Sequence, residues 1–334
     1  MSKTWKAILI FTATIIFVGI GWIAYKSINS IYLLPQPSLG RGIYKIVGID
    51  PGKGLIWSPN GKYLAGLIVG DPPMPDFPCL GCDPHSEIFI LDLEKMKRRT
   101  VISSDKFDKF GHTISWFLDS EHIAYNGEGA GSKQVIRSIH IDGTIDVQFM
   151  AETRIPSWHP DKPLLVLADE RRESDEWYAT IHLVDLSTMK KELIFQGEYP
   201  NALIWSLSWS ADGKTLAFSY GAAGQQETQK PNIFLWDLET RKLTQFTNDK
   251  FEYIAADFSP LNNIIALQQW RDTSGVTILK DLTNNCEIEL PILSTVSASW
   301  SPDGNKLVIS TEGDAYIVDL TEYAGSTDSI CSLP

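Results

Sequence analysis

The sequence predicts an all-β protein: a six-bladed β-propeller, closed by its own N-terminal strand and preceded by a single transmembrane helix. Three observations lead to this prediction. A short phrase of the type "SWSPDG" occurs six times, a strand-like apolar segment ending in Asp follows each copy, and one long apolar run stands near the N-terminus. Repeats of about 40 to 50 residues are typical of propeller blades.

The apolar run covers residues 7–25, which carry no charge and stand between Lys6 and Lys26. As a helix this segment is about 28 Å long, close to the hydrocarbon thickness of a bilayer. A cleaved signal peptide is the alternative, but the run exceeds a usual signal core and no A-x-A site follows it. We therefore predict an uncleaved anchor at the cell membrane.

Basic residues are denser on the short N-terminal side of this segment. Their density predicts that residues 1–6 are cytoplasmic and that the large domain lies on the extracytoplasmic side. Residues 26–42 are interpreted as a tether, because Pro35 and Pro37 disfavour a helix there.

Each repeated phrase centres on an aromatic residue that is expected to end the first strand, a, of a blade and to fill the space between blades. The six aromatic residues are Trp57, Trp116, Trp158, Trp209, Phe258 and Trp300. Pro and Asp suit the centre of the following turn, and Gly suits its left-handed position, so each phrase predicts a hairpin between strands a and b. The copies "FLDSEH" and "FSPLNN" depart from the pattern, and their turns are expected to differ.

The third strand, c, of each blade is predicted at the apolar segments 87–93, 136–142, 180–186, 232–238, 276–282 and 314–320. The sixth unit has no segment for a fourth strand, d, whereas an extra strand-like segment, 42–49, precedes the first unit. We expect this N-terminal strand to complete the last blade, since closure removes the free edge of the ring. The propeller then spans 43–323, and 324–334 form a C-terminal tail.

The combination of "WSPDG", "LxxS" and "xIxxxDL" over about residues 43–323 resembles the WD40-like, PD40-type repeats of TolB-like six-bladed propellers. The resemblance implies the fold. It does not imply the role of TolB, which has an additional N-terminal domain where this chain has an apolar run.

The formal net charge of −12 argues against a nucleic-acid partner, which would require a basic surface. No catalytic motif is found, and the six histidines are scattered. We therefore predict no catalytic residue, no cofactor and no metal site. The sequence indicates no oligomeric state.

The four cysteines allow several interpretations. Cys79 and Cys82 lie in the proline-rich insertion 70–87, where a disulfide is favoured over a metal site or a redox centre. Cys286 and Cys331 are expected on the same face of adjacent blades. They form either a second disulfide or two free thiols.

The connections between strands b and c are the longest and most polar loops, and they are predicted to share one face: 70–87, 128–133, 169–178, 220–232 and 269–275. Long loops on a rigid scaffold commonly carry function. The candidate interaction residues are Trp177, Tyr178, Trp270, Arg271, Arg171 and Arg172. We predict that this face binds a protein, a peptide or a glycan. The alternative is a hydrolase, lactonase or lyase with its site at the central channel.

Overall fold

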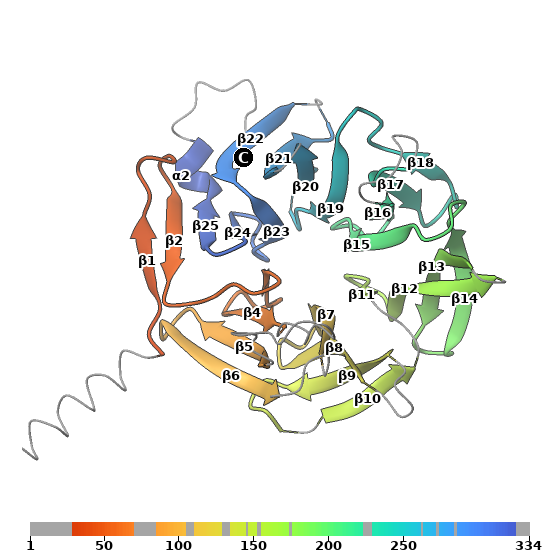
Figure 1. Ribbon diagram of the computed structural model, residues 1–334, viewed down its shortest axis with the longest axis horizontal. Helices are drawn as coiled ribbons and strands as arrows, with labels where there is room; N and C mark the ends of the chain where they lie inside the picture. The colour runs from red at the N-terminus through yellow and green to blue at the C-terminus, as the bar shows by residue number, and fades with distance from the viewer. Residues whose placement is uncertain are drawn as a thin grey trace, which may run out of the picture.

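The computed structural model describes residues 29–69, 85–104, 110–128, 134–144, 146–151, 155–173, 176–222, 229–261, 263–271, 274–283 and 286–324. These residues form six antiparallel sheets arranged as a ring, which confirms the six-bladed propeller (Figure 1). Among them no helix is long and apolar enough to cross a membrane. The predicted span, 7–25, lies outside the described residues and stays a prediction.

The strands follow one another around the ring in chain order. Blade 1 contains β3 (Leu55–Trp57), β4 (Tyr63–Ile68), β5 (Ser86–Asp92) and β6 (Lys97–Ser104). Blade 2 contains β7 (Phe110–Trp116), β8 (His122–Glu128), β9 (Gln134–His140) and β10 (Asp146–Ala151). Blade 3 contains β11 (Ile155–Trp158), β12 (Leu164–Glu173), β13 (Glu176–Asp185) and β14 (Lys190–Gln196).

Blade 4 contains β15 (Leu203–Trp209), β16 (Thr215–Gly221), β17 (Asn232–Asp237) and β18 (Leu243–Gln245). Blade 5 contains β19 (Glu252–Phe258), β20 (Ile264–Arg271), β21 (Ser274–Asp281) and β22 (Glu287–Leu293). Blade 6 contains β23 (Thr295–Trp300), β24 (Lys306–Thr311), β25 (Ala315–Asp319), β2 (Ile43–Val47) and β1 (Tyr32–Pro35). The short helix α2 (Leu320–Ala324) follows β25.

The ring closes as the sequence predicts. Strand β2 pairs with β25 in antiparallel register, with Ile43 opposite Val318. The N-terminal strand therefore completes the blade that the C-terminal part of the chain begins, and the two ends of the propeller are held in one sheet.

The prediction of a tether over 26–42 misses a fifth strand in blade 6. Residues Tyr32–Pro35 form β1, which pairs with β2. Just before it, Ile31 is fully buried, and its N–H donates a 3.0 Å hydrogen bond to the Met96 carbonyl in blade 1. Pro35 is compatible with this strand because it lies at the end of a sheet edge, where a missing N–H breaks no ladder.

The repeated phrase folds as a hairpin corner held by its serine. In blade 4 the Ser210 hydroxyl donates to Asp212 at 2.7 Å and accepts the N–H of Thr215 at 2.9 Å. The turn glycine, Gly213, has φ of 65°, the left-handed conformation that favours glycine. Blades 1 and 6 repeat this arrangement around Ser58 and Ser301.

The structure fully describes one of the two turns with an unusual phrase, the turn of blade 2. The turn of blade 2 was expected to differ, but Ser120 takes the same left-handed conformation, with φ of 60°. Its hydroxyl accepts the N–H of Asn60 from blade 1 at 3.0 Å. The turn of blade 5 contains residue 262, which lies outside the described residues.

The hydrophobic core consists of six clusters, and each cluster lies between two neighbouring blades. The repeat aromatics belong to these clusters as predicted. Trp209 of blade 4, for example, packs with Val166 and Ile181 of blade 3. The stability of the ring therefore comes from blade-to-blade burial, roughly 2 kcal/mol for each large apolar side chain.

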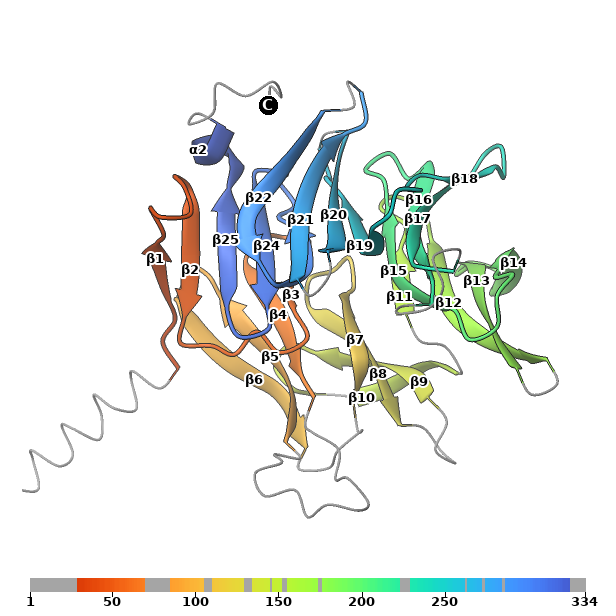
Figure 2. The ribbon, with the colours of Figure 1, turned by 45° about the horizontal axis from the view of Figure 1, so that its top comes forward.

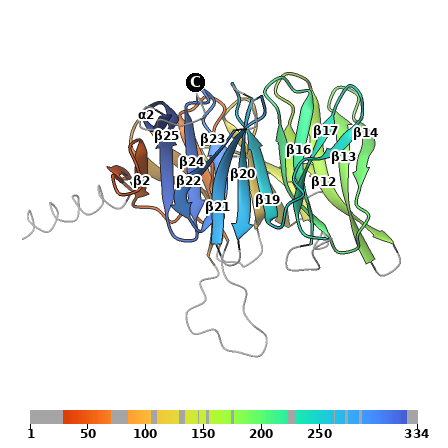
Figure 3. The ribbon, with the colours of Figure 1, turned by 90° about the horizontal axis from the view of Figure 1, so that it is seen from above.

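The ring has two sides, named here after their hairpins (Figure 3). The a–b side carries the repeated turns and α2, and the b–c side carries the connections between second and third strands together with the blade-to-blade crossings. Two segments predicted as loops on the b–c side are strand hairpins instead. Arg171 pairs with Tyr178 in blade 3, and Trp270 pairs with Gly275 in blade 5.

Candidate binding channel and b–c side

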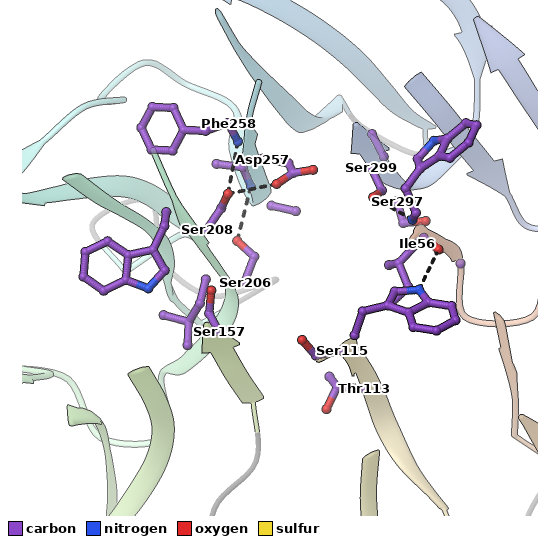
Figure 4. Close-up of a pocket in the computed structure, with 18 of the residues that line it drawn as sticks. Ile56, Thr113, Ser115, Ser157, Ser206, Ser208, Asp257, Phe258, Ser297 and Ser299 are labelled. Carbon is purple, nitrogen blue, oxygen red and sulfur yellow. Dashed lines mark hydrogen bonds between the residues drawn. The ribbon is translucent and has the colours of Figure 1, made fainter. Parts of the chain in front are cut away.

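The first strands of the six blades surround a central channel with a volume of about 590 Å³ (Figure 4). Hydroxyl groups dominate the polar part of its wall: Thr113, Ser115, Ser157, Ser206, Ser208, Ser297 and Ser299. In each blade, the residue just before the repeat aromatic lines the channel. This residue is serine in four blades, isoleucine in blade 1 and aspartate in blade 5.

Several of these channel residues also join neighbouring blades. The Ser208 hydroxyl accepts the N–H of Phe258 at 3.1 Å, and the Ser299 hydroxyl accepts the N–H of Trp57 at 3.3 Å. In both cases the oxygen belongs to one blade and the N–H to the repeat aromatic of the next blade. Ser208 and Ser299 therefore have a structural role at the junctions between blades.

Asp257 takes the place of this serine in blade 5. One carboxylate oxygen accepts the Ser208 hydroxyl at 2.8 Å, and the other accepts the N–H of Trp300 at 3.2 Å. Burial outweighs these two hydrogen bonds and raises the pKa of Asp257 to about 6, although the residue as a whole is only partly buried and lines the channel. No basic side chain of the described residues pairs with it.

The two mouths of the channel differ in chemistry. The a–b mouth is lined by Pro59, Leu118, Pro160, Ala211 and Pro260, so it is mainly apolar. The b–c mouth presents the exposed Lys53 and Trp205, and the Trp205 side chain is 39% exposed. A bulge between β15 and β16 leaves Trp205 without a cross-strand partner, and its indole N–H donates to the Gly221 carbonyl at 3.1 Å. This mouth offers stacking, a positive charge and hydroxyl groups to a ligand.

The predicted interaction residues of blade 3 lie at the tip of the β12–β13 hairpin. Trp177 is 43% exposed and Arg171 is exposed. Arg172 pairs with Trp177 through the backbone, and its side chain lies outside the described structure. The Tyr178 hydroxyl donates to Glu176 at 2.9 Å.

The predicted residues of blade 5 make contacts within their own blade. Arg271 forms an ion pair of 2.7 Å with Glu289, and its guanidinium carbon lies 5.2 Å from the centre of the Phe251 ring. Trp270 is partly buried. Blade 4 separates these residues from the blade 3 hairpin, so the six candidates form two groups (Figure 2).

The sequence reasoning missed three features of the site: Trp205, Asp257 and the hydroxyl wall. A signal for the wall was present, because "SW" occurs in four of the six phrases, at 115–116, 157–158, 208–209 and 299–300. The blade 5 phrase has Asp at the same position. Trp205 has no repeat signal.

Only one of the four cysteines, Cys286, lies within the described residues. Cys79 and Cys82 lie outside the described residues, as does Cys331. Cys286 is disulfide-bonded, and its partner is outside the described part of the chain. The pairing with Cys331 therefore stays a prediction. Within the described residues, no group of three His, Cys, Asp or Glu side chains could hold a metal ion.

The sequence comparisons identify one family model. The model of "Eukaryotic translation initiation factor eIF2A" matches residues 158–319, slightly less than half of the chain. No curated protein matches the sequence.

The structural comparisons give many similar propellers. A putative TolB from Agrobacterium tumefaciens has a TM-score of 0.55 at 16% identity, over 82% of this chain and 91% of that chain. The β-propeller domain of the trilobed protease from Pyrococcus furiosus, described as having an open velcro topology, has a TM-score of 0.54 at 13% identity, over 88% and 94% of the two chains. An oligogalacturonate lyase in complex with manganese has a TM-score of 0.54 at 12% identity, over 87% and 96%.

At such identities the likeness concerns the fold alone, and the neighbours include TolB, a protease domain and a lyase. The fold therefore does not choose between a binding protein and an enzyme. Together with the strand order, the comparisons establish that this chain has the fold of a six-bladed β-propeller, similar to the propellers of the TolB structures.

Proposed function

We propose that this protein is a non-enzymatic binding propeller that engages a protein, peptide or glycan partner through its b–c side. The apolar run at 7–25 supports attachment to the cell membrane by a single span, and the basic residues before it support an extracytoplasmic propeller. The net negative charge argues against a nucleic-acid partner, because it would repel the phosphates.

One observation carries this proposal. Among the described tryptophans only Trp177 and Trp205 are exposed, and both lie on the b–c side of adjacent blades. A hydrogen bond of 2.7 Å from the Asn201 N–H to the Trp177 carbonyl joins the blade 3 hairpin to the crossing that leads into β15. Tryptophan is the residue type most enriched at binding hot spots, so two on one side indicate a docking surface.

The channel mouth beside Trp205 supplies the polar part of such a surface. Lys53 can pair with a carboxylate or phosphate of the partner, and Ser206 can accept or donate hydrogen bonds. Aromatic contact at the edge and polar contact in the channel would together fix the orientation of an inserted segment.

Affinity capture with detergent-solubilised full-length protein tests this function. The double variant Trp177→Ala, Trp205→Ala should capture at least about tenfold less partner than the wild type, because it lacks two hot-spot residues. The matched control is Leu243→Ala, an exposed apolar residue on the outer strand of blade 4. Equal capture by all three proteins, with unchanged melting temperatures, would remove the b–c side from the binding function.

The second candidate function is an enzyme at the channel, and Asp257 is the observation that favours it. A carboxyl group with a pKa near 6 is suited to general acid–base catalysis near neutral pH. Assays with hydrolase, lactonase and lyase substrates test this candidate. Activity that Asp257→Asn abolishes would establish it, and activity that the variant retains would place the chemistry elsewhere.

A further inference from the structure

The outer rim where blades 6 and 1 meet carries an exposed apolar strand. In β1 the side chains of Tyr32, Leu33 and Leu34 are 54%, 36% and 49% exposed. This strand is the outermost of its sheet, so its free edge faces away from the ring (Figure 1). An apolar strand at an open edge is unusual for a soluble surface, because proteins commonly protect such edges with charged residues.

The residues just before this strand pair with a segment of blade 1 that carries basic residues. Ser30, two residues before β1, forms a β-bridge with Lys97 at the start of β6, and the N–H of Arg98 donates to the Asn29 carbonyl at 2.8 Å. Lys97 and Arg99 are exposed and make no ion pair within the described residues. Two cations without an ion pair in the described part of the chain stand out near the start of this apolar strand, because the formal net charge of the protein is −12.

The chain length between this rim and the predicted span restricts where the rim can lie. Only residues 26–28 separate the apolar run from Asn29, which is hydrogen-bonded to blade 1. The four steps from residue 25 to residue 29 reach at most about 14 Å. If 7–25 cross the bilayer, the rim therefore lies at the level of the lipid headgroups or just above it.

We propose that Tyr32, Leu33, Leu34, Lys97 and Arg99 form a membrane-contacting rim that binds the headgroup layer of an anionic phospholipid bilayer. This inference rests on the membrane attachment in the proposed function. Tyrosine and leucine suit the interface, where water still hydrates the free backbone groups of the strand edge, and the two cations attract lipid phosphates. Such contact holds the propeller with its rim on the membrane and leaves the b–c side accessible.

Site-specific photo-crosslinking tests this rim with the full-length protein in nanodiscs that contain 30% phosphatidylglycerol in phosphatidylcholine. Leu34 is replaced by the photoreactive residue p-benzoylphenylalanine. The matched control carries the same residue in place of Leu243, which is 41% exposed on β18 at the opposite side of the ring. We expect lipid adducts from position 34 at a yield at least about fivefold above position 243.

Charge reversal tests the basic part of the rim. Lys97→Glu with Arg99→Glu should lower the lipid adduct at position 34 by about fivefold or more, since each basic residue near an anionic surface contributes on the order of a fivefold preference. Lys190→Glu with Lys242→Glu, an equal charge change on blades 3 and 4, should leave the adduct unchanged. Equal adduct yields at positions 34 and 243, or adducts at position 34 to protein in place of lipid, would overturn the proposal.

Carbonate extraction of native membranes separates this inference from the attachment on which it rests. If the protein resists extraction and position 34 gives no lipid adduct, the rim is wrong and the attachment stands. If carbonate releases the protein, the attachment is wrong and the rim proposal fails with it.

Discussion

Replacement of Asp257 by asparagine should stabilise the protein at neutral pH. The wild-type carboxylate is held between the Ser208 hydroxyl and the Trp300 N–H, without a basic partner among the described residues. An asparagine can keep both contacts, because its carbonyl oxygen can accept the Trp300 N–H and its amide can donate to Ser208. The substitution therefore removes a charge without breaking the junction between blades 4, 5 and 6.

The size of the effect follows from the pKa. Burial raises the pKa of Asp257 to about 6 in the folded protein, whereas an unfolded chain has a value of about 3.8. The folded state thus binds the proton of Asp257 more tightly than the unfolded state does. Ionisation of Asp257 therefore lowers the unfolding free energy as the pH rises from about 4 to 6. The difference corresponds to at most about 3 kcal/mol above pH 6, and we expect about 1 to 3 kcal/mol because Asp257 is only partly buried and lines the channel.

Chemical denaturation between pH 5 and pH 7.5 measures this effect. The gain in unfolding free energy of Asp257→Asn should be largest at pH 7.5 and should fall by roughly half at pH 5. Asp212→Asn is the matched control. It should lower the unfolding free energy, because the Lys214 N–H and the Ser210 hydroxyl stabilise the ionised Asp212 and lower its pKa. A variant that is less stable than wild type at pH 7.5 would refute the account of Asp257.

Three further predictions concern the ring itself. Gly213→Ala should lower the unfolding free energy by at least about 2 kcal/mol, since a Cβ there would lie 2.3 Å from the His159 ring at a φ of +65°. In the same denaturation assay, Gly313→Ala should change it by less than about 0.5 kcal/mol, because a Cβ at Gly313 would have no atom within 4 Å. Ile43→Ala should cost about 2 to 5 kcal/mol, because this fully buried side chain joins β2 to the core between blades 5 and 6; an effect as small as that of the exposed Leu33→Ala would contradict closure by β2. Burial lowers the pKa of His182 to about 4, so below about pH 6.5 the unfolded chain binds a proton that the folded protein excludes. The unfolding free energy of the wild type should therefore fall by about 1 to 2 kcal/mol between pH 7 and pH 5, and that of His182→Leu should not, as measured by urea titrations at both pH values.

The repeated phrase made most of the fold predictable. Each phrase contains its own turn chemistry and its own packing aromatic, so the hairpins and the blade count follow from local sequence, and the missing strand of the sixth unit points to β2. Strand β1 was missed because Pro35 suggested a tether. The outer ends of β12 and β13 were missed because "DERRESDEWY" is as polar as a loop, although a hairpin that extends beyond the core needs no apolar side chains.

The candidate site was less predictable because its geometry depends on distant partners. Asp257 becomes unusual only beside Ser208, which is 49 positions away in the chain. Trp205 is exposed at the channel mouth because a bulge, which recurs in blades 5 and 6, breaks the two-residue alternation of β15. This position lies before the repeated phrase, so the phrase does not indicate it. The phrase itself indicated packing, and the direction of its serine toward the channel became clear only in the closed ring.

Photo-crosslinking in living cells tests whether a partner docks on the b–c side. The photoreactive p-benzoylphenylalanine replaces Trp177, Trp205 or, on the opposite mouth, the exposed Leu118. If a partner docks on the b–c side, we expect one adduct of the same mass from positions 177 and 205 and none from position 118. Adducts from position 118 alone, or none from positions 177 and 205, would contradict it.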